Sequence, residues 1–313
     1  MSARSAIPVS RLAVLAHPQQ SYAEAALARL RESAARHKIE IVELQKSAGA
    51  LSDRPCQAVV SVGGNGTLLA AVRHAYPADI PVWGVNVGQL GFLTTSGIDE
   101  IEAHVGRLAE GRYWVESRAM IEGVIDCGKG FETRLVALND IVVHRQVPGG
   151  GLMVLDCELD DRFLATYEAD GLIVSTPTGS TGYTLSAGGS ILSPTLPAFI
   201  ITPICAHSFS SRSLVVDDSS VLVVRPRLKT EGEVAFATAD GQAVATLSNC
   251  AVRTVERGPS GPHRDEKHPD FCKVILRKAV RSAGLVRFDE VFFSDVLRDK
   301  LGWAEGAPGN RTQ

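Results

Sequence analysis

Three glycines surround one asparagine in Gly63-Gly64-Asn65-Gly66, a combination that could hold a phosphate group. The β-branched run Val59 to Val62 precedes it, and a helix-forming stretch begins at Thr67. A strand that ends in a tight glycine turn and continues as a helix presents free backbone N–H groups at the positive end of the helix dipole. The segment therefore predicts a phosphate-binding turn.

A second polar segment, from Asp170 to Gly189, is rich in glycines and hydroxyl side chains. Its pattern predicts a strand, a loop and a short helix. Hydroxyls can hold ribose and base edges, and glycines let the backbone approach a ligand closely. A tight strand-to-helix connection with ordinary capping would explain the same residues, so this segment alone leaves both interpretations open.

A third segment places an amide beside a carboxylate, Asn139-Asp140, just before the β-rich run Ile141 to Arg145. By itself this pair is typical of a turn. Only in combination with the two glycine-rich segments would it indicate a binding site.

Other polar side chains have simpler structural explanations. A lone His207 after a strand end is more often a structural hydrogen-bonding group than a base. His144 and Arg145 could bind phosphate, but they are more typical of a solvated strand end. The adjacent carboxylates Asp160-Asp161 and Asp217-Asp218 would point to opposite faces of a strand, so they are interpreted as turn residues.

These segments must be positioned by two kinds of structure. Residues 11–110 alternate between strand-like and helix-like segments with short loops, which predicts a Rossmann-like α/β domain with a parallel sheet. The expected strands are Leu12–Leu15, Ile39–Leu44, Ala58–Val62 and Pro81–Asn86, and the expected helices are Tyr22–Arg36, Thr67–His74 and Asp99–Glu110.

From Tyr113 to about Arg277 the chain shows many short β-rich runs, which predict an antiparallel sandwich-like domain. One helix is expected after Tyr183 and another over residues 289–303. The expected strands are Met120–Ile125, Arg134–Leu138, Ile141–Arg145, Met153–Leu159, Arg162–Glu168, Leu172–Ser175, Ala198–Pro203, Ser213–Val216, Val221–Pro226, Val234–Ala239, Ala243–Leu247 and Ala251–Glu256.

The expected domain boundaries follow from this change of character. Residues 1–115 would form the α/β domain with the tail 285–304 packing back on it, residues 116–284 the β-domain, and residues 305–313 a frayed end. Arg257–Pro269 is polar and rich in Gly and Pro, so we expect a loop there.

The composition excludes several classes of function. The chain has 313 residues, a net charge of −3, 45% hydrophobic and 21% charged residues, which is typical of a globular protein. The chain lacks the excess of basic charge that would indicate a nucleic-acid partner. No run approaches about 18 apolar residues and no signal-peptide core is present, so we expect no membrane span and a cytoplasmic location.

The cysteines form no Cys-x-x-Cys pair, and most stand in apolar runs. We expect buried, reduced thiols rather than disulfides or metal ligands. The six positions are Cys56, Cys127, Cys157, Cys205, Cys250 and Cys272.

Seven segments have the residues and the order that are typical of the bacterial NAD kinase family, which the chain resembles from about residue 10 to residue 303. Each segment is a weak signal alone, but seven in the same order are specific. They are the glycine turn with Thr67-Leu68-Leu69, Asn86-x-Gly88-x-Leu90-Gly91-Phe92-Leu93, Asn139-Asp140, Asp170-Gly171 leading into Thr176-Pro177-Thr178-Gly179-Ser180-Thr181, Thr202-Pro203-Ile204-Cys205 with His207 and Arg212, Asp240-Gly241-Gln242, and Lys300-Leu301-Gly302-Trp303.

The resemblance implies a fold and a reaction. The fold is an α/β N-terminal domain, a β-sandwich C-terminal domain and a tail that returns to the first domain. The reaction moves the terminal phosphoryl group of ATP or polyphosphate to the 2′-hydroxyl of the adenosine ribose of NAD, giving NADP, with help from Mg²⁺ or another divalent cation. Family members are dimers or tetramers, so a homodimer or homotetramer is expected.

The resemblance also implies site residues. The catalytic position is Asn65, no residue is assigned as a metal ligand, and the remaining positions bind NAD. The phosphate is faced by Gly64, Asn65, Gly66 and Thr67, and the adenosine is bordered by Phe92. Ribose hydroxyls and adenine are held by Asn139 and Asp140, and the nicotinamide half is met by Asp170. The rest of the site is lined by Thr178, Thr181, Gly182, Tyr183, Ser186 and Gln242.

Asn65 stands where the family has the aspartate of its Gly-Gly-Asp-Gly-Thr motif. An amide cannot hold the proton of the attacking hydroxyl and is a poor partner for Mg²⁺. If the aspartate is the general base, the rate of phosphoryl transfer by this chain is expected to be lower by a factor of about 10²–10⁴. Binding is expected to persist, because the amide is isosteric and removes a negative charge near phosphates.

Three explanations of Asn65 stay open: an engineered substitution, a homologue that keeps only dinucleotide binding, and a kinase that acts on a different nucleotide-like acceptor. Diacylglycerol kinases share the glycine turn. Asn139-Asp140 and Asp170-Gly171 argue against a lipid kinase, because in the family these residues serve an adenine dinucleotide.

Overall fold

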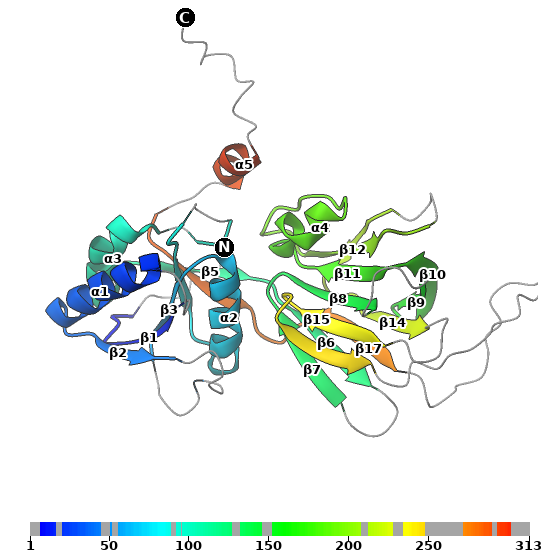
Figure 1. Ribbon diagram of the computed structural model, residues 1–313, viewed down its shortest axis with the longest axis horizontal. Helices are drawn as coiled ribbons and strands as arrows, with labels where there is room; N and C mark the ends of the chain where they lie inside the picture. Colours follow the sequence, from blue (N-terminus) through cyan, green and yellow to red (C-terminus); the bar gives the residue numbers. More distant parts are fainter. Residues whose placement is uncertain are drawn as a thin grey trace, which may run out of the picture. The chain divides into compact units, whose positions relative to one another are not determined.

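The computed structural model describes residues 7–16, 21–44, 51, 56–88, 92–94, 96–126, 132–145, 152–207, 212–227, 234–247, 272–289 and 293–301. The chain divides into two compact units (Figure 1). The first unit comprises Met1–Arg118 and Arg281–Gln313, and the second comprises Ala119–Val280. The expected strand Ala251–Glu256, the loop Arg257–Pro269 and the end from residue 305 lie outside the described residues.

The first unit is built on a six-stranded sheet in the order β2-β1-β3-β4-β18-β5. Strands β1 to β4 pair in parallel, and β18 is parallel to β4 but antiparallel to β5. The bounds are β1 (Arg11–Ala16), β2 (Glu40–Glu43), β3 (Ala58–Val62), β4 (Val82–Val85), β5 (Trp114–Arg118) and β18 (Ala283–Arg287). The predicted parallel sheet is confirmed, and strand β18, which was not predicted, completes it.

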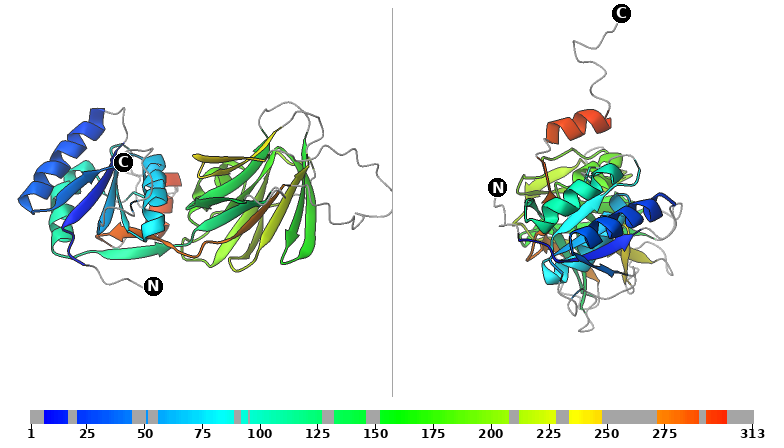
Figure 2. Two further views of the ribbon diagram at one scale, coloured as in Figure 1. Left: turned by 90° about the horizontal axis from the view of Figure 1, so that it is seen from below. Right: turned by 90° about the vertical axis from the view of Figure 1, so that its left-hand side faces the viewer.

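Helices cover both faces of this sheet (Figures 1 and 2). Helices α1 (Ser21–Arg36) and α3 (Ile101–Ala109) pack together on one face, and α2 (Asn65–Ala75) lies on the other. Burial from both sides explains why every residue of β3 and β4 is buried. The last described helix is α5 (Phe293–Leu301).

The second unit contains two six-stranded sheets whose neighbouring strands are all antiparallel. One sheet has the order β10-β9-β14-β17-β6-β7 and the other β13-β12-β11-β8-β15-β16. The strands are β6 (Ile121–Asp126), β7 (Glu132–Ala137), β8 (Asp140–Arg145), β9 (Met153–Leu159), β10 (Arg162–Ala169), β11 (Gly171–Ser175), β12 (Ala198–Ile204), β13 (Leu214–Asp217), β14 (Leu222–Arg227), β15 (Ala235–Ala239), β16 (Ala243–Leu247) and β17 (Lys273–Lys278).

The two sheets enclose one apolar core, to which both contribute, for example Leu155 and Val224 from one sheet and Val143 and Ile201 from the other. The predicted sandwich is therefore confirmed. After β11 the chain forms a 3₁₀ turn, Gly179–Thr181, and the short helix α4 (Tyr183–Ser186).

The cysteines follow the prediction only in part. Cys56 and Cys157 are buried free thiols, and burial together with the Asp156 carboxylate raises the pKa of Cys157 to about 12. Cys205 is an exposed free thiol, because the backbone leaves the sheet there with a φ of +48°. Cys272 is buried and disulfide-bonded. The disulfide of Cys272 contradicts the expectation of reduced thiols, and the spacing of the cysteines gives no signal for it.

Within the described part of the chain, the helices are too short or too polar to cross a membrane.

Candidate functional site

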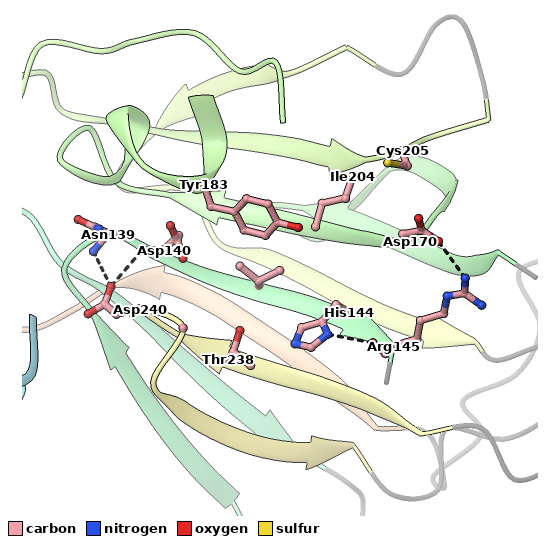
Figure 3. Close-up of a pocket in the computed structure, with 12 residues that line it drawn as sticks. Asn139, Asp140, His144, Arg145, Asp170, Tyr183, Ile204, Cys205, Thr238 and Asp240 are labelled. Atoms are coloured by element: carbon pink, nitrogen blue, oxygen red, sulfur yellow. Dashed lines mark hydrogen bonds and ion pairs between the residues drawn. The ribbon is translucent and has the colours of Figure 1, made fainter. Parts of the chain in front are cut away.

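A cavity of about 600 Å³ lies on the second unit, on the side of the sheet β8-β15 that faces away from the core (Figure 3). Side chains alternate along a strand, so Asp140 and Val142 of β8 face the cavity while Ile141 and Val143 enter the core. The lining residues are Asn139, Asp140, Val142, His144, Arg145, Asp170, Tyr183, Ile204, Cys205, Thr238, Asp240 and Gly241. Cavities of this volume accommodate small organic ligands.

The carboxylate of Asp240 fixes one end of this cavity. Its Oδ1 accepts the backbone N–H of Asn139 at 2.7 Å and that of Asp140 at 3.3 Å, and its Oδ2 accepts the N–H of Leu138 at 3.1 Å. In return, the N–H of Asp240 donates to the carbonyl of Asp140 at 3.0 Å. The segment before β8 is thereby tied to the end of β15.

Asp240 reaches this position because of the turn in which it lies. Asp240 and Gly241 have φ values of +52° and +62°, and Gln242 N–H donates to the Ala239 carbonyl at 3.0 Å. Two consecutive positive φ values closed by this bond form a type I′ hairpin turn, for which Asp-Gly is a preferred pair.

The loop after β11 holds the same segment from the other side. Thr176 accounts for two bonds: its N–H donates to the Asn139 carbonyl at 2.8 Å and its hydroxyl to the Leu138 carbonyl at 2.6 Å. A Cβ on Gly179 would lie 2.1 Å from the Asn139 carbonyl oxygen, so only glycine allows this approach. The structure therefore brings Asn139-Asp140 and the 170–189 segment together.

The electrostatics of the cavity centre on Asp140, which is 5% exposed. Burial, followed by the negative charge of Asp240, raises the pKa of Asp140 to about 7. Near neutral pH this carboxyl exists in both forms, and its protonated form can donate a hydrogen bond.

At the other end of the cavity Arg145 forms an ion pair with Asp170, with 3.1 Å between Nη2 and Oδ1 (Figure 3). The side chain of Arg145 is 8% exposed, so the interpretation of this position as a solvated strand end was wrong. The carboxylate of Asp170 stabilises the buried guanidinium, which explains how a charged side chain can lie there.

Four of the residues predicted from the resemblance line the cavity together: Asn139, Asp140, Asp170 and Tyr183. Others of the second unit lie outside its lining, namely Thr178, Thr181, Gly182, Ser186 and Gln242, of which Thr178 is buried. The lining residues that were not predicted as site residues are Val142, His144, Arg145, Ile204, Cys205, Thr238, Asp240 and Gly241. The signal for Val142 and His144 was the alternation along β8, and that for Asp240 and Gly241 was the Asp-Gly hairpin pair.

The remaining predicted residues belong to the first unit, where strand, glycine turn and helix follow one another. Helix α2 begins at Asn65 with Gly64 as its N-cap, and Gly64, Asn65 and Gly66 are exposed whereas Thr67 is buried. The carbonyl of Gly64 accepts the N–H of Thr67 at 3.0 Å. The first turn of α2 contains no acidic residue. Phe92 is half-buried.

Comparison with known proteins agrees with these observations. The family model of the ATP-NAD kinase N-terminal domain matches residues 9–113, and that of the ATP-NAD kinase C-terminal domain matches residues 138–263. The NAD kinase of Wolinella succinogenes is 38% identical over 247 residues, 79% of this chain and 76% of that protein. The NAD kinase of Sulfurimonas denitrificans is 31% identical over 306 residues, 95% and 98% of the two chains.

A solved structure shares the fold. The structure of yeast NADH kinase complexed with NADH has a TM-score of 0.78 and 23% sequence identity, and the match covers 98% of this chain and 91% of the yeast chain.

Proposed function

The chain belongs to the NAD kinase family, and we propose that it transfers the terminal phosphoryl group of ATP to the 2′-hydroxyl of the adenosine ribose of NAD, giving NADP. The observation that supports this most directly is the cavity of the second unit. Four side chains implied by the resemblance, Asn139, Asp140, Asp170 and Tyr183, meet in one space of about 600 Å³.

The cavity offers the donors and acceptors that a dinucleotide needs. The Oδ1 atom of Asn139 is buried and has no hydrogen-bond partner among the described residues, so it can accept from an amino group of a base. Asp140 can accept from a ribose hydroxyl or, when protonated, donate to the ligand. Tyr183 and Ile204 supply apolar surface for a ring. The proposed contacts of Thr178, Thr181, Gly182, Ser186 and Gln242 would surround this core.

The phosphate and reacting hydroxyl are proposed to lie at the start of α2. The exposed Gly64, Asn65 and Gly66 stand at the positive end of the helix dipole, which favours an anion. Thr67 and Phe92 complete the proposed site in the first unit. In this arrangement Asn65 can donate or accept a hydrogen bond at the attacking hydroxyl but cannot remove its proton.

Mg²⁺ is proposed to enter with the phosphates of ATP, as it does in many phosphoryl-transfer enzymes. The described residues contain no group of three or more His, Cys, Asp or Glu side chains that could hold a metal ion. The first turn of α2 offers an amide oxygen instead of a carboxylate. These residues fit a directly held Mg²⁺ poorly, and no step is assigned to a protein-bound metal.

Assembly into a homodimer or homotetramer is also proposed. Strand β13 is at the edge of its sheet and exposes two consecutive apolar side chains, Leu214 at 37% and Val215 at 45%. An exposed apolar edge strand is prone to pair with another chain. Light scattering on the eluting protein gives the mass of the particle, and a mass of about 33 kDa would contradict the proposal.

A kinetic comparison tests the proposed catalysis. With NAD, ATP and Mg²⁺, the unaltered chain is expected to form NADP slowly or not at all. Asn65→Asp is expected to be at least about 100-fold faster, because general-base help contributes about 10²–10⁴ in rate. Asn65→Ala is the matched control and should gain nothing. All three proteins should bind NADP in calorimetry.

The outcomes separate the alternatives. Full activity of the unaltered chain would show that the residue at position 65 is not the base. Inactivity of both the unaltered chain and Asn65→Asp, with NADP binding retained, would favour the second candidate, a dinucleotide-binding homologue without kinase activity. That candidate is kept because of the missing carboxylate in the first turn of α2.

A further inference from the structure

Three consecutive backbone N–H groups, those of Leu138, Asn139 and Asp140, converge on the single carboxylate of Asp240 at 2.7 to 3.3 Å. Successive N–H groups directed at one point form an anion-binding concavity. Here the anion is the chain's own side chain. Bonds to an ionised acceptor are roughly twice as strong as neutral ones, so the arrangement is rigid for a loop that precedes a strand.

We propose that Asp240 is a positioning residue for nucleotide binding: its carboxylate fixes the backbone of residues 138–140 and thereby directs the side chains of Asn139 and Asp140 into the cavity. This inference rests on the proposed function. Thr176 donates to the carbonyls of Leu138 and Asn139 from the opposite side, so both the N–H groups and the carbonyls of the segment are held.

The position of Asp240 has a second effect that a merely structural residue would lack. Its charge lies close enough to Asp140 to raise the pKa of that carboxyl, in addition to the larger effect of burial. The other titratable groups around the cavity are His144, Arg145, Asp170, Tyr183 and Cys205. Removing the charge of Asp240 should therefore change both the affinity for the nucleotide and its dependence on pH.

The test is the dissociation constant of NAD, which has no phosphate monoester that titrates in this range, measured by calorimetry between pH 5 and pH 9. For the unaltered chain, affinity should fall as pH rises past about 7, since ionised Asp140 adds a second negative charge beside Asp240. Asp240→Asn keeps the shape of the side chain, and asparagine tolerates the positive φ. One carboxylate oxygen becomes an NH₂ group, which cannot accept a hydrogen bond from the backbone N–H that it faces. The affinity of this variant should be about 10- to 100-fold weaker. The fall in affinity with rising pH, here called the pH step, should occur at a lower pH than in the unaltered chain.

Asp160→Asn is the matched control. Asp160 also has a positive φ, +51°, in a hairpin turn, and its Oδ1 accepts the N–H of Val221 at 2.9 Å, but it does not line the cavity. This variant should bind NAD like the unaltered chain at every pH.

Retention of both the affinity and the pH step by Asp240→Asn would overturn the inference while leaving the proposed function intact. If Asp240→Asn fails to fold, Asp240→Glu decides, because it keeps the negative charge but moves the carboxylate by one methylene relative to the three N–H groups. A weaker affinity of Asp240→Glu supports the inference, and an affinity equal to that of the unaltered chain overturns it. An unaltered chain that binds neither NAD nor NADP would overturn the proposed function and this inference with it.

Discussion

Replacing Asp140 by asparagine is expected to stabilise the second unit at alkaline pH but not at pH 4. The carboxyl of Asp140 has a pKa of about 7 in the folded chain against an ordinary value of 3.8. Between these two values the folded state binds more protons than the unfolded state, so stability falls as pH rises through this window. A pKa difference of about 3, at about 1.36 kcal/mol per unit, corresponds to about 4 kcal/mol.

Asparagine has nearly the shape of the protonated acid and does not titrate. The free energy of unfolding of Asp140→Asn should therefore match that of the unaltered chain near pH 4 and exceed it by about 4 kcal/mol above pH 8. Domains are stable by only about 5–15 kcal/mol in total, so a difference of this size is readily measured.

Urea unfolding at a series of pH values, followed by far-UV circular dichroism, measures this difference. The described tryptophans, Trp83 and Trp114, belong to the first unit, so their fluorescence is an internal control that should not respond to the substitution. A difference between the two proteins that stays constant from pH 4 to pH 8.5 would refute the reasoning, since it would mean that Asp140 titrates alike in the folded and unfolded states.

Three further substitutions test other contacts. Gly179→Ala places a Cβ 2.1 Å from the Asn139 carbonyl oxygen, so NADP affinity should fall at least about 10-fold. The free energy of unfolding, measured in urea, should fall by about 1–3 kcal/mol. Unchanged binding would contradict the described packing. Gly241→Ala meets no atom within 4 Å, so thermal unfolding should show only the cost of φ +62°, about 1–2 kcal/mol. Arg287→Met breaks the buried 2.7 Å ion pair with Glu116 and should destabilise the first unit by about 3–5 kcal/mol, measured by tryptophan fluorescence in urea.

Local signals in the sequence were sufficient for most of the fold. The run Val59 to Val62 followed by glycines predicted β3 and the turn before α2, and the helix begins at Asn65, two residues earlier than expected. Here Gly66 is compatible with a first helical turn, although glycine is a poor helix former in a helix interior. The alternating runs of the second unit predicted its strands because each has one face in the core and the other face outside it.

Contacts between distant residues could not be predicted in this way. Asp240 is 101 residues from Asn139, and nothing in its hairpin pattern indicates which N–H groups its carboxylate will meet. Strand β18 contains Gly284 in a short segment, and its strand neighbours β4 and β5 are more than 160 residues away in the sequence. Arg145 follows a strand pattern that is equally typical of a solvated end, and its burial depends on Asp170.

The place of β18 between β4 and β5 has a consequence for synthesis on the ribosome. The chain leaves the first unit after Arg118 and re-enters it at Arg281, so every residue of the second unit is made before β18 can pair with β4 and β5. While the sandwich is synthesised, the edge of β4 that later pairs with β18 has no strand partner. The second unit can therefore be the first to close its core, contrary to the usual order in which the N-terminal unit folds first.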